Sequence, residues 1–193
     1  IEAKVATIEF GHPASNSFPA PLLHELTKTI ETLGQNPEVE VLVLKSQGTA
    51  AFCAGASFDE LLAVTNQTEG KAFFSGFAHL INAMRKCPKL IVGRVQGKAV
   101  GGGVGIAAAC DYVLASQEAS IKLSELAIGI GPFVIEPAVS RKIGKTALAE
   151  LSLTAQEWKS AAWAKEKGLY AKTFETIEKL DKAVTDFVTT LSA

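Results

Sequence analysis

Two short runs of small residues have the composition of anion-binding turns. One covers residues 52–56 and the other residues 100–103, and in each a predicted strand leads through the turn into a predicted helix. The unpaired N–H groups at a helix N-terminus carry partial positive charge, so each turn is a natural place for an anion. If the fold brings the turns together, two N–H groups can converge on one oxygen and stabilise an enolate or a tetrahedral anion. For either turn alone, the alternative is that its glycines only permit close packing of a strand against a helix.

Three other motifs fail on their spacing. A Walker phosphate loop needs Ser or Thr after Gly-Lys, but the pair Gly97-Lys98 is followed by alanine. The dinucleotide-binding pattern GxGxxG fails because Ile106 stands where its last glycine is required. A GxSxG nucleophile elbow around Ser57 fails because Asp59 replaces the second glycine. The sequence therefore disfavours nucleotide binding and serine hydrolysis.

The cysteines and histidines form neither a metal-binding nor a disulfide pattern. Three cysteines cannot all pair, none lies in a CxxC motif, and the histidines lack a spacing such as HExxH. These residues are Cys53, Cys87, Cys110, His12, His24 and His79. We expect no metal site and a reducing, cytoplasmic location.

The elements that must position the two turns alternate as in a parallel α/β domain. The predicted strands are residues 4–10, 39–44 and 90–95, with short candidates at 112–115 and 120–123. Two helices are predicted over residues 22–33 and 71–86. Another begins after the capping box of Ser57 and Glu60, and an alanine-rich helix follows the glycine cluster and ends near Asp111. Thr154 and Glu157 form another capping box, which predicts a helix that ends at Gly168, and a last helix is expected over 176–191. With no repeat, low-complexity tract or linker, we expect a single domain over residues 1–193.

Composition excludes several classes of partner. With 19 Lys and Arg against 20 Asp and Glu, the net charge of −1 provides no cationic field for nucleic acid. The longest apolar run, residues 99–110, is well short of the roughly 18 to 20 residues that cross a bilayer. Since hydrophobic residues make up 48% of the chain, a substantial core is available. We expect a folded, water-soluble protein.

Three motifs in order, AFCAGASFDEL, CPKLIVGRVQGKAVGGGVGIAAACDYVLAS and ASIKLSELAIGIGP, resemble the crotonase, or enoyl-CoA hydratase/isomerase, superfamily. The resemblance covers essentially the whole chain. It implies an α/β fold of ββα turns wound into a spiral, homotrimers or dimers of trimers, and acyl-CoA thioester substrates, with coenzyme A as part of the substrate and no further cofactor. The family continues into a C-terminal helical segment that completes the trimer contacts, and we expect this chain to stop inside it.

The resemblance also implies roles for particular residues. The oxyanion donors match the backbone N–H groups of Ala56 and Gly102, which belong to the two turns identified above. Substrate or CoA contacts are implied at Ala54, Ser57, Phe58, Gly101 and Phe133, and Phe77 is a further candidate for the pocket wall. A thioester oxygen between the two donors would acidify its α-carbon and be stabilised as an enolate.

The acid/base groups depart from the family pattern. Typical hydratases carry a carboxylate two residues beyond the glycine triplet, where this chain has Gly105. The second family carboxylate matches Glu125, whose apolar neighbours favour burial and a raised pKa. One carboxylate can move a proton between C2 and C4 of an enoyl chain or activate a water for hydration. The overall run of motifs favours an enoyl-CoA hydratase, with double-bond isomerisation and a non-catalytic acyl-CoA-binding relative as alternatives.

Further departures bear on other branches of the family. Relatives that dehalogenate aryl-CoAs or shift conjugated dienes place an Asp soon after the GIG turn, where this chain has Pro132-Phe133. A lysine common near Asp59 is also absent, and we expect its possible substitutes, Lys86, Lys89 and Lys98, to be solvated surface residues. Asp111 is expected to be structural, and Glu136 is expected to face solvent on a helix.

Overall fold

The computed structural model describes residues 1–193 and contains two parallel β-sheets. The larger sheet has the strand order β1-β2-β4-β6-β8, and the smaller has the order β3-β5-β7. The strands are β1 (Val5–Phe10), β2 (Val41–Ser46), β3 (Ala51–Cys53), β4 (Leu90–Val95), β5 (Lys98–Val100), β6 (Tyr112–Ser116), β7 (Ile121–Lys122) and β8 (Lys172–Phe174). From β2 to β7 the chain alternates between the sheets, one strand in the large sheet and the next in the small one. This is the expected spiral of ββα turns.

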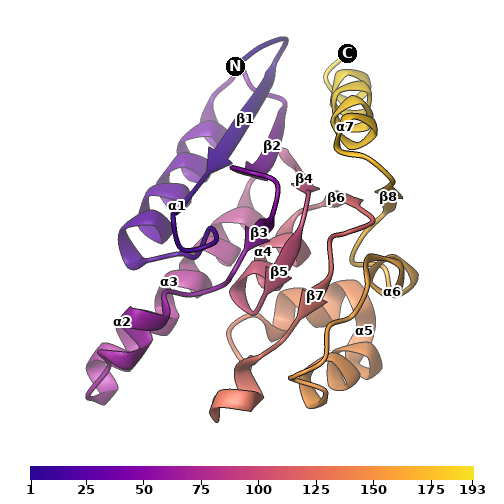
Figure 1. Cartoon of the computed structure of the whole chain (residues 1–193). Helices are drawn as coiled ribbons and strands as arrows, with labels where there is room; N and C mark the ends of the chain where they lie inside the picture. The colour runs from indigo at the N-terminus through magenta and orange to yellow at the C-terminus, as the bar shows by residue number, and fades with distance from the viewer.

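The helices close each turn of the spiral (Figure 1). They are α1 (Ala20–Gln35), α2 (Phe58–Leu62), α3 (Gln67–Lys86), α4 (Gly102–Ala109), the 3₁₀ helix η1 (Glu125–Ile128), α5 (Glu136–Leu153), α6 (Ala161–Glu166) and α7 (Ile177–Leu191). In Figure 1, α7 lies at the top with both chain ends, and α2 and η1 lie at the lower end. None of the helices has both the length and the apolar character needed to cross a membrane.

The central strands of the large sheet are buried on both faces, which explains why β2 reads as VLVL rather than as an alternating pattern. The edge strand β1 alternates between buried and exposed residues. Leu42 and Leu44 belong to the main core, together with residues of α1, α3 and α4. Val41 and Val43 face the other way, into a second apolar cluster formed with α7. The large sheet is thereby a rigid base from which the short strands of the small sheet extend.

A buried polar network connects the two sheets. Arg94 on β4 donates to Asp181 of α7 over 2.8 Å and to Gln96 over 3.3 Å. The Gln96 amide in turn donates to Ser46 Oγ (2.8 Å) and to the carbonyl of Ala51 (3.0 Å). Since Ala51 begins β3, this network fixes the strand that leads into the first turn.

Several sequence predictions need correction. Thr154 does not cap a helix; it ends α5, and its hydroxyl donates to the Glu150 carbonyl over 2.9 Å. The following helix is the shorter α6, which Ser160 caps by accepting from the Trp163 N–H over 3.1 Å. Strand β8 was not predicted, nor were β3 and β5, because a strand of three residues shows no clear periodicity.

The capping of α2 was only half right. Ser57 caps this helix and accepts from the Glu60 N–H over 3.3 Å. The Glu60 carboxylate does not complete the capping box, since it accepts from the N–H of Ala20 over 3.0 Å. It therefore connects α2 to the start of α1.

Candidate active site

The two small-residue turns lie side by side. Strands β3 and β5 are parallel neighbours, so the turns that follow them come to one edge of the small sheet. Gly55 and Gly101 both have positive φ, at 90° and 52°. A methyl group on Gly55 would lie 2.9 Å from the Val100 carbonyl oxygen and 3.5 Å from the Gly102 nitrogen. Glycine is therefore required for both the backbone conformation and the close approach.

Two backbone donors are free at this junction. Phe18 pairs with Gly55 and Ser57 on either side of Ala56, and these bonds leave the Ala56 N–H without an acceptor in the chain. Gly102 is the first residue of α4, so its N–H has no acceptor within the helix. Both residues line the same pocket. The arrangement suits one negatively charged oxygen bound by two N–H groups.

Glu125 provides the carboxylate of the pocket. It is the first residue of η1, and its Oε1 lies against Gly101, where a methyl group would be only 2.8 Å away. The other oxygen, Oε2, is buried and has no hydrogen-bond partner. Burial away from water raises the pKa of Glu125, while a backbone hydrogen bond opposes this shift. An unpartnered buried oxygen with a raised pKa is suited to take up and return a proton.

The pocket between these groups has a volume of about 180 Å³. Its lining comes from α2, α3, the β5–α4 turn and η1, and Figure 1 shows α2 and η1 at the lower end of the molecule. Six of the expected site residues besides Glu125 line it: Ala54, Ala56, Ser57, Phe58, Gly101 and Gly102. The predicted wall residue Phe77 also lines it and packs closely over Gly102.

Phe133 does not contribute to the pocket. Its side chain is 82% exposed and folds back against Gly131, while the next two residues, Val134 and Ile135, line the pocket instead. The resemblance to the family correctly predicted that this segment borders the pocket, but it did not predict which of its side chains face the pocket.

Other lining residues escaped the sequence analysis. Most are apolar, namely Leu61, Phe73, Phe74, Ile128, Ile130, Val134 and Ile135, and Ser124 adds a hydroxyl group. Phe73 lies four residues before Phe77, on the same face of α3, and this spacing was a usable signal. Leu61, Phe74 and Ile128 also lie on helices, whereas Ile130, Val134 and Ile135 come from the irregular segment before α5, where periodicity carries no information.

The position of the missing carboxylate is closed. A methyl group on Gly105 would lie 2.5 Å from Ile135 Cγ2 and 3.3 Å from Ile81 Cδ1. Gly105 itself is buried inside α4. The space that a second acidic side chain would need is therefore filled by apolar groups.

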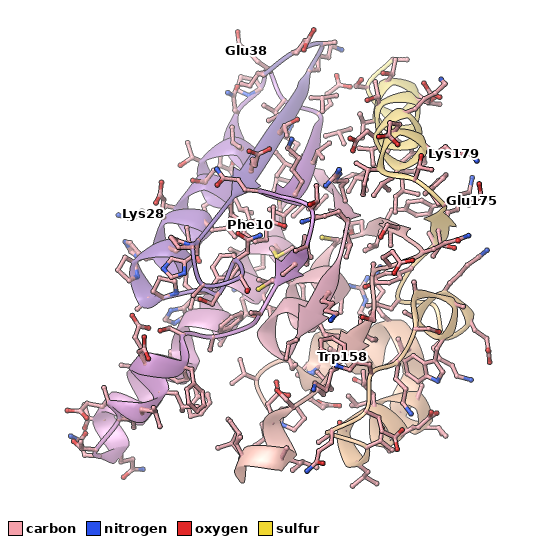
Figure 2. The ribbon with its side chains drawn as sticks, viewed as in Figure 1. Phe10, Lys28, Glu38, Trp158, Glu175 and Lys179 are labelled. Atoms are coloured by element: carbon pink, nitrogen blue, oxygen red, sulfur yellow. The ribbon has the colours of Figure 1, made fainter.

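The remaining candidates lie elsewhere. Asp111 is structural, as expected: its Oδ2 accepts from the Ile91 N–H over 2.8 Å. Lys98 lies 5.0 Å from the ring centre of Trp158, which Figure 2 labels beside the small sheet. Lys86 borders a larger, separate groove between α1 and α3, about 680 Å³, which contains neither Glu125 nor the two turns.

The wound ββα turns, with two small-residue turns meeting at a buried carboxylate, are the architecture of the crotonase fold. An enoyl-CoA hydratase/isomerase (crotonase) from Legionella pneumophila has the same fold, with a TM-score of 0.92 and 30% identity over 98% of this chain and 73% of that one. The family model for enoyl-CoA hydratase/isomerase matches residues 1–192, and the chain belongs to this family.

Relatives within the family differ in reaction. A peroxisomal Delta(3,5)-Delta(2,4)-dienoyl-CoA isomerase of Arabidopsis thaliana is 31% identical over 83% of this chain and 62% of its own length. A short-chain-enoyl-CoA hydratase of Clostridium acetobutylicum is 32% identical over 94% of this chain and 70% of its own length. The chain thus spans less than two thirds of the first relative.

Proposed function

We propose that this chain moves the double bond of an enoyl-CoA thioester from C3 to C2, with Glu125 as its single acid/base. The observation that carries this proposal is the closed space beside Gly105, where Ile135 stands in place of a second carboxylate. Isomerisation needs one group that removes a proton and returns it nearby. Hydration needs a water molecule to be held and activated as well.

In the proposed reaction the thioester oxygen binds between the N–H groups of Ala56 and Gly102. This polarises the carbonyl, and the Glu125 carboxylate removes a proton from C2. The C2–H electron pair forms a dienolate whose negative oxygen is held by the two donors. Glu125 then returns the proton to C4 as the double bond settles between C2 and C3. Atoms and charge balance, and the reaction needs no cofactor beyond the coenzyme A of the substrate.

The raised pKa of Glu125 supports this role. A carboxylate of ordinary pKa is a weak base for a carbon acid, and burial makes Glu125 a stronger one. Gly101 contributes by having no side chain, so that the carboxylate can approach the reacting carbons.

Hydration is the second candidate, favoured by the sequence motifs and by the similarity to the C. acetobutylicum hydratase over 94% of this chain. Glu125 would then activate a water and return its proton to C2. Ser57 and Ser124 are the two hydroxyl side chains in the lining that could hold that water. A non-catalytic acyl-CoA binder is the third candidate.

Ultraviolet absorbance of the conjugated enoyl thioester separates the three candidates. Wild type and Glu125→Gln receive 3-hexenoyl-CoA and, separately, 2-hexenoyl-CoA, and calorimetry measures the binding of each thioester. Isomerisation predicts that absorbance rises with the 3-enoyl substrate, and that the variant loses this activity but still binds. A fall with the 2-enoyl substrate indicates hydration. Silence with both substrates, with binding intact, would identify a binder.

A further inference from the structure

The lining of the acyl pocket contains a single ionisable side chain. Of its 20 residues, only Glu125 can carry a charge, and no lysine, arginine or histidine is among them. Most of the remaining lining is hydrocarbon, including Phe73 and Phe77 from α3 and Ile130 and Ile135 from the segment before α5.

The lysines of the strands that build the site are engaged elsewhere. Lys98 of β5 and Lys122 of β7 both point to Trp158, with ammonium groups 5.0 Å and 4.7 Å from the ring centre. Trp158 does not line the pocket. Neither lysine is therefore placed to neutralise a negative charge beside Glu125.

A second carboxylate in this pocket would be doubly unfavourable. It would lose hydration without gaining a cation, and an unpaired buried charge is costly. It would also share a poorly solvated space with Glu125, and like charges at close range in such a medium repel strongly. Glu125 Oε2 already lacks a partner, and the N–H groups of Ala56 and Gly102 are assigned to the thioester oxygen. Only the uncharged hydroxyls of Ser57 and Ser124 remain in the lining to hydrogen-bond a second carboxylate.

We infer that the pocket is selective for uncharged hydrocarbon acyl groups and discriminates against acyl groups that carry a terminal carboxylate. This inference rests on the proposed function, because it assumes that the acyl part of a CoA thioester occupies the pocket beside Glu125. It narrows the substrate from any enoyl-CoA to the thioesters of monocarboxylic acids.

A matched pair of saturated thioesters tests this selectivity without turnover. Glutaryl-CoA and 5-methylhexanoyl-CoA have the same chain length and shape, because two methyl groups replace the two carboxylate oxygens. Titration calorimetry at neutral pH should give a Kd for glutaryl-CoA at least about tenfold weaker, consistent with an unpaired buried charge. The difference should shrink as the pH is lowered toward the pKa of the glutaryl carboxyl.

A cation placed at the pocket should remove the discrimination. Ile128 lines the pocket and is 51% exposed, so Ile128→Lys is compatible with the fold, and Ile128→Met is the neutral control of similar length. The lysine variant should bind glutaryl-CoA about tenfold more tightly than wild type does, whereas the methionine variant should not.

The outcomes are distinct. Equal affinity of wild type for the two thioesters would overturn the selectivity and leave the proposed reaction standing. Failure of wild type to bind either thioester would overturn both. Weaker binding of glutaryl-CoA that Ile128→Lys restores and Ile128→Met does not would support the inference, even if the enoyl assay showed no turnover.

Discussion

Glu125 lies directly against Gly101, so that a methyl group on this glycine would stand 2.8 Å from Oε1. The two residues belong to segments joined by the small sheet, since the Gly101 N–H donates to the Lys122 carbonyl over 2.9 Å. The glycine in the turn proposed to bind the oxyanion thus also makes room for the proposed acid/base. One position serves both halves of the site.

Replacement of Gly101 by alanine should therefore cause a large loss of kcat and only a moderate loss of folding stability. The positive φ of 52° costs about 1–3 kcal/mol of stability for a residue with a side chain. The displaced carboxylate and the shifted Gly102 donor should lower kcat by at least about 100-fold. Thermal unfolding and the isomerase assay measure the two effects. Near-wild-type turnover would contradict the position given to Glu125.

Glu125→Gln should lower kcat by about 10² to 10⁴-fold and leave thioester affinity within a few-fold of wild type. The amide keeps the shape of the carboxyl but cannot take up the proton. Assays with enzyme in excess over substrate measure the rate of turnover, and calorimetric titration of a saturated acyl-CoA measures the thioester affinity. Glu136→Gln is the matched control, because that glutamate begins α5 and does not line the pocket.

The raised pKa of Glu125 predicts a particular dependence of stability on pH. Its folded-state pKa lies above the ordinary value near 4.5, so the folded protein holds this proton to higher pH than the unfolded chain does. The stability that this carboxyl contributes is present below its unfolded pKa and is lost as the pH rises through the folded pKa. Urea unfolding should therefore show Glu125→Gln gaining stability relative to wild type as the pH rises from acid to neutral. If the unfolding free energy of Glu125→Gln did not rise relative to that of wild type over this pH range, the carboxylate would be better solvated than its burial indicates.

Gly105→Glu, which would restore the second carboxylate of typical hydratases, should destabilise the chain. Ile135 Cγ2 would lie 2.5 Å from the new Cβ, and such overpacking costs about 1–3 kcal/mol before the buried charge is added. Combining it with Ile135→Ala should recover part of this loss and raise hydration of 2-hexenoyl-CoA. Ile135→Ala alone controls for the enlarged pocket. A Gly105→Glu variant as stable as wild type would mean that Ile135 moves aside easily.

The corrected start of α6 can be tested by two alanine substitutions. Ser160→Ala removes the side-chain acceptor of the Trp163 N–H and should cost about 1 kcal/mol. Thr154→Ala removes only a hydroxyl that donates to a carbonyl on its own helix, so it should cost a few tenths of a kcal/mol. Denaturant unfolding measures the loss of stability in each variant. Equal losses would argue against Ser160 as the cap of α6.

Much of the site was predictable because its parts are locally encoded. The two glycine turns, the Ser57 cap of α2 and the helical periodicity of α3 and α7 all depend on residues a few positions apart. The resemblance of the motifs to the crotonase family supplied the order of the spiral and the register of Glu125. Local hydrogen bonds and side-chain periods leave a signature in the sequence, so these features could be predicted.

Other features depended on contacts between distant segments. Strands of three residues, such as β3 and β8, exist only because neighbouring strands complete their hydrogen bonds. The space beside Gly105 is closed by Ile135, which lies thirty residues further along the chain. Phe133, two residues before Ile135, points outward to solvent. The sequence by itself determined which residues could bind an oxyanion and which carboxylate could move a proton. Only the tertiary structure decided that no second carboxylate fits beside them, because packing between distant segments determines which space is filled.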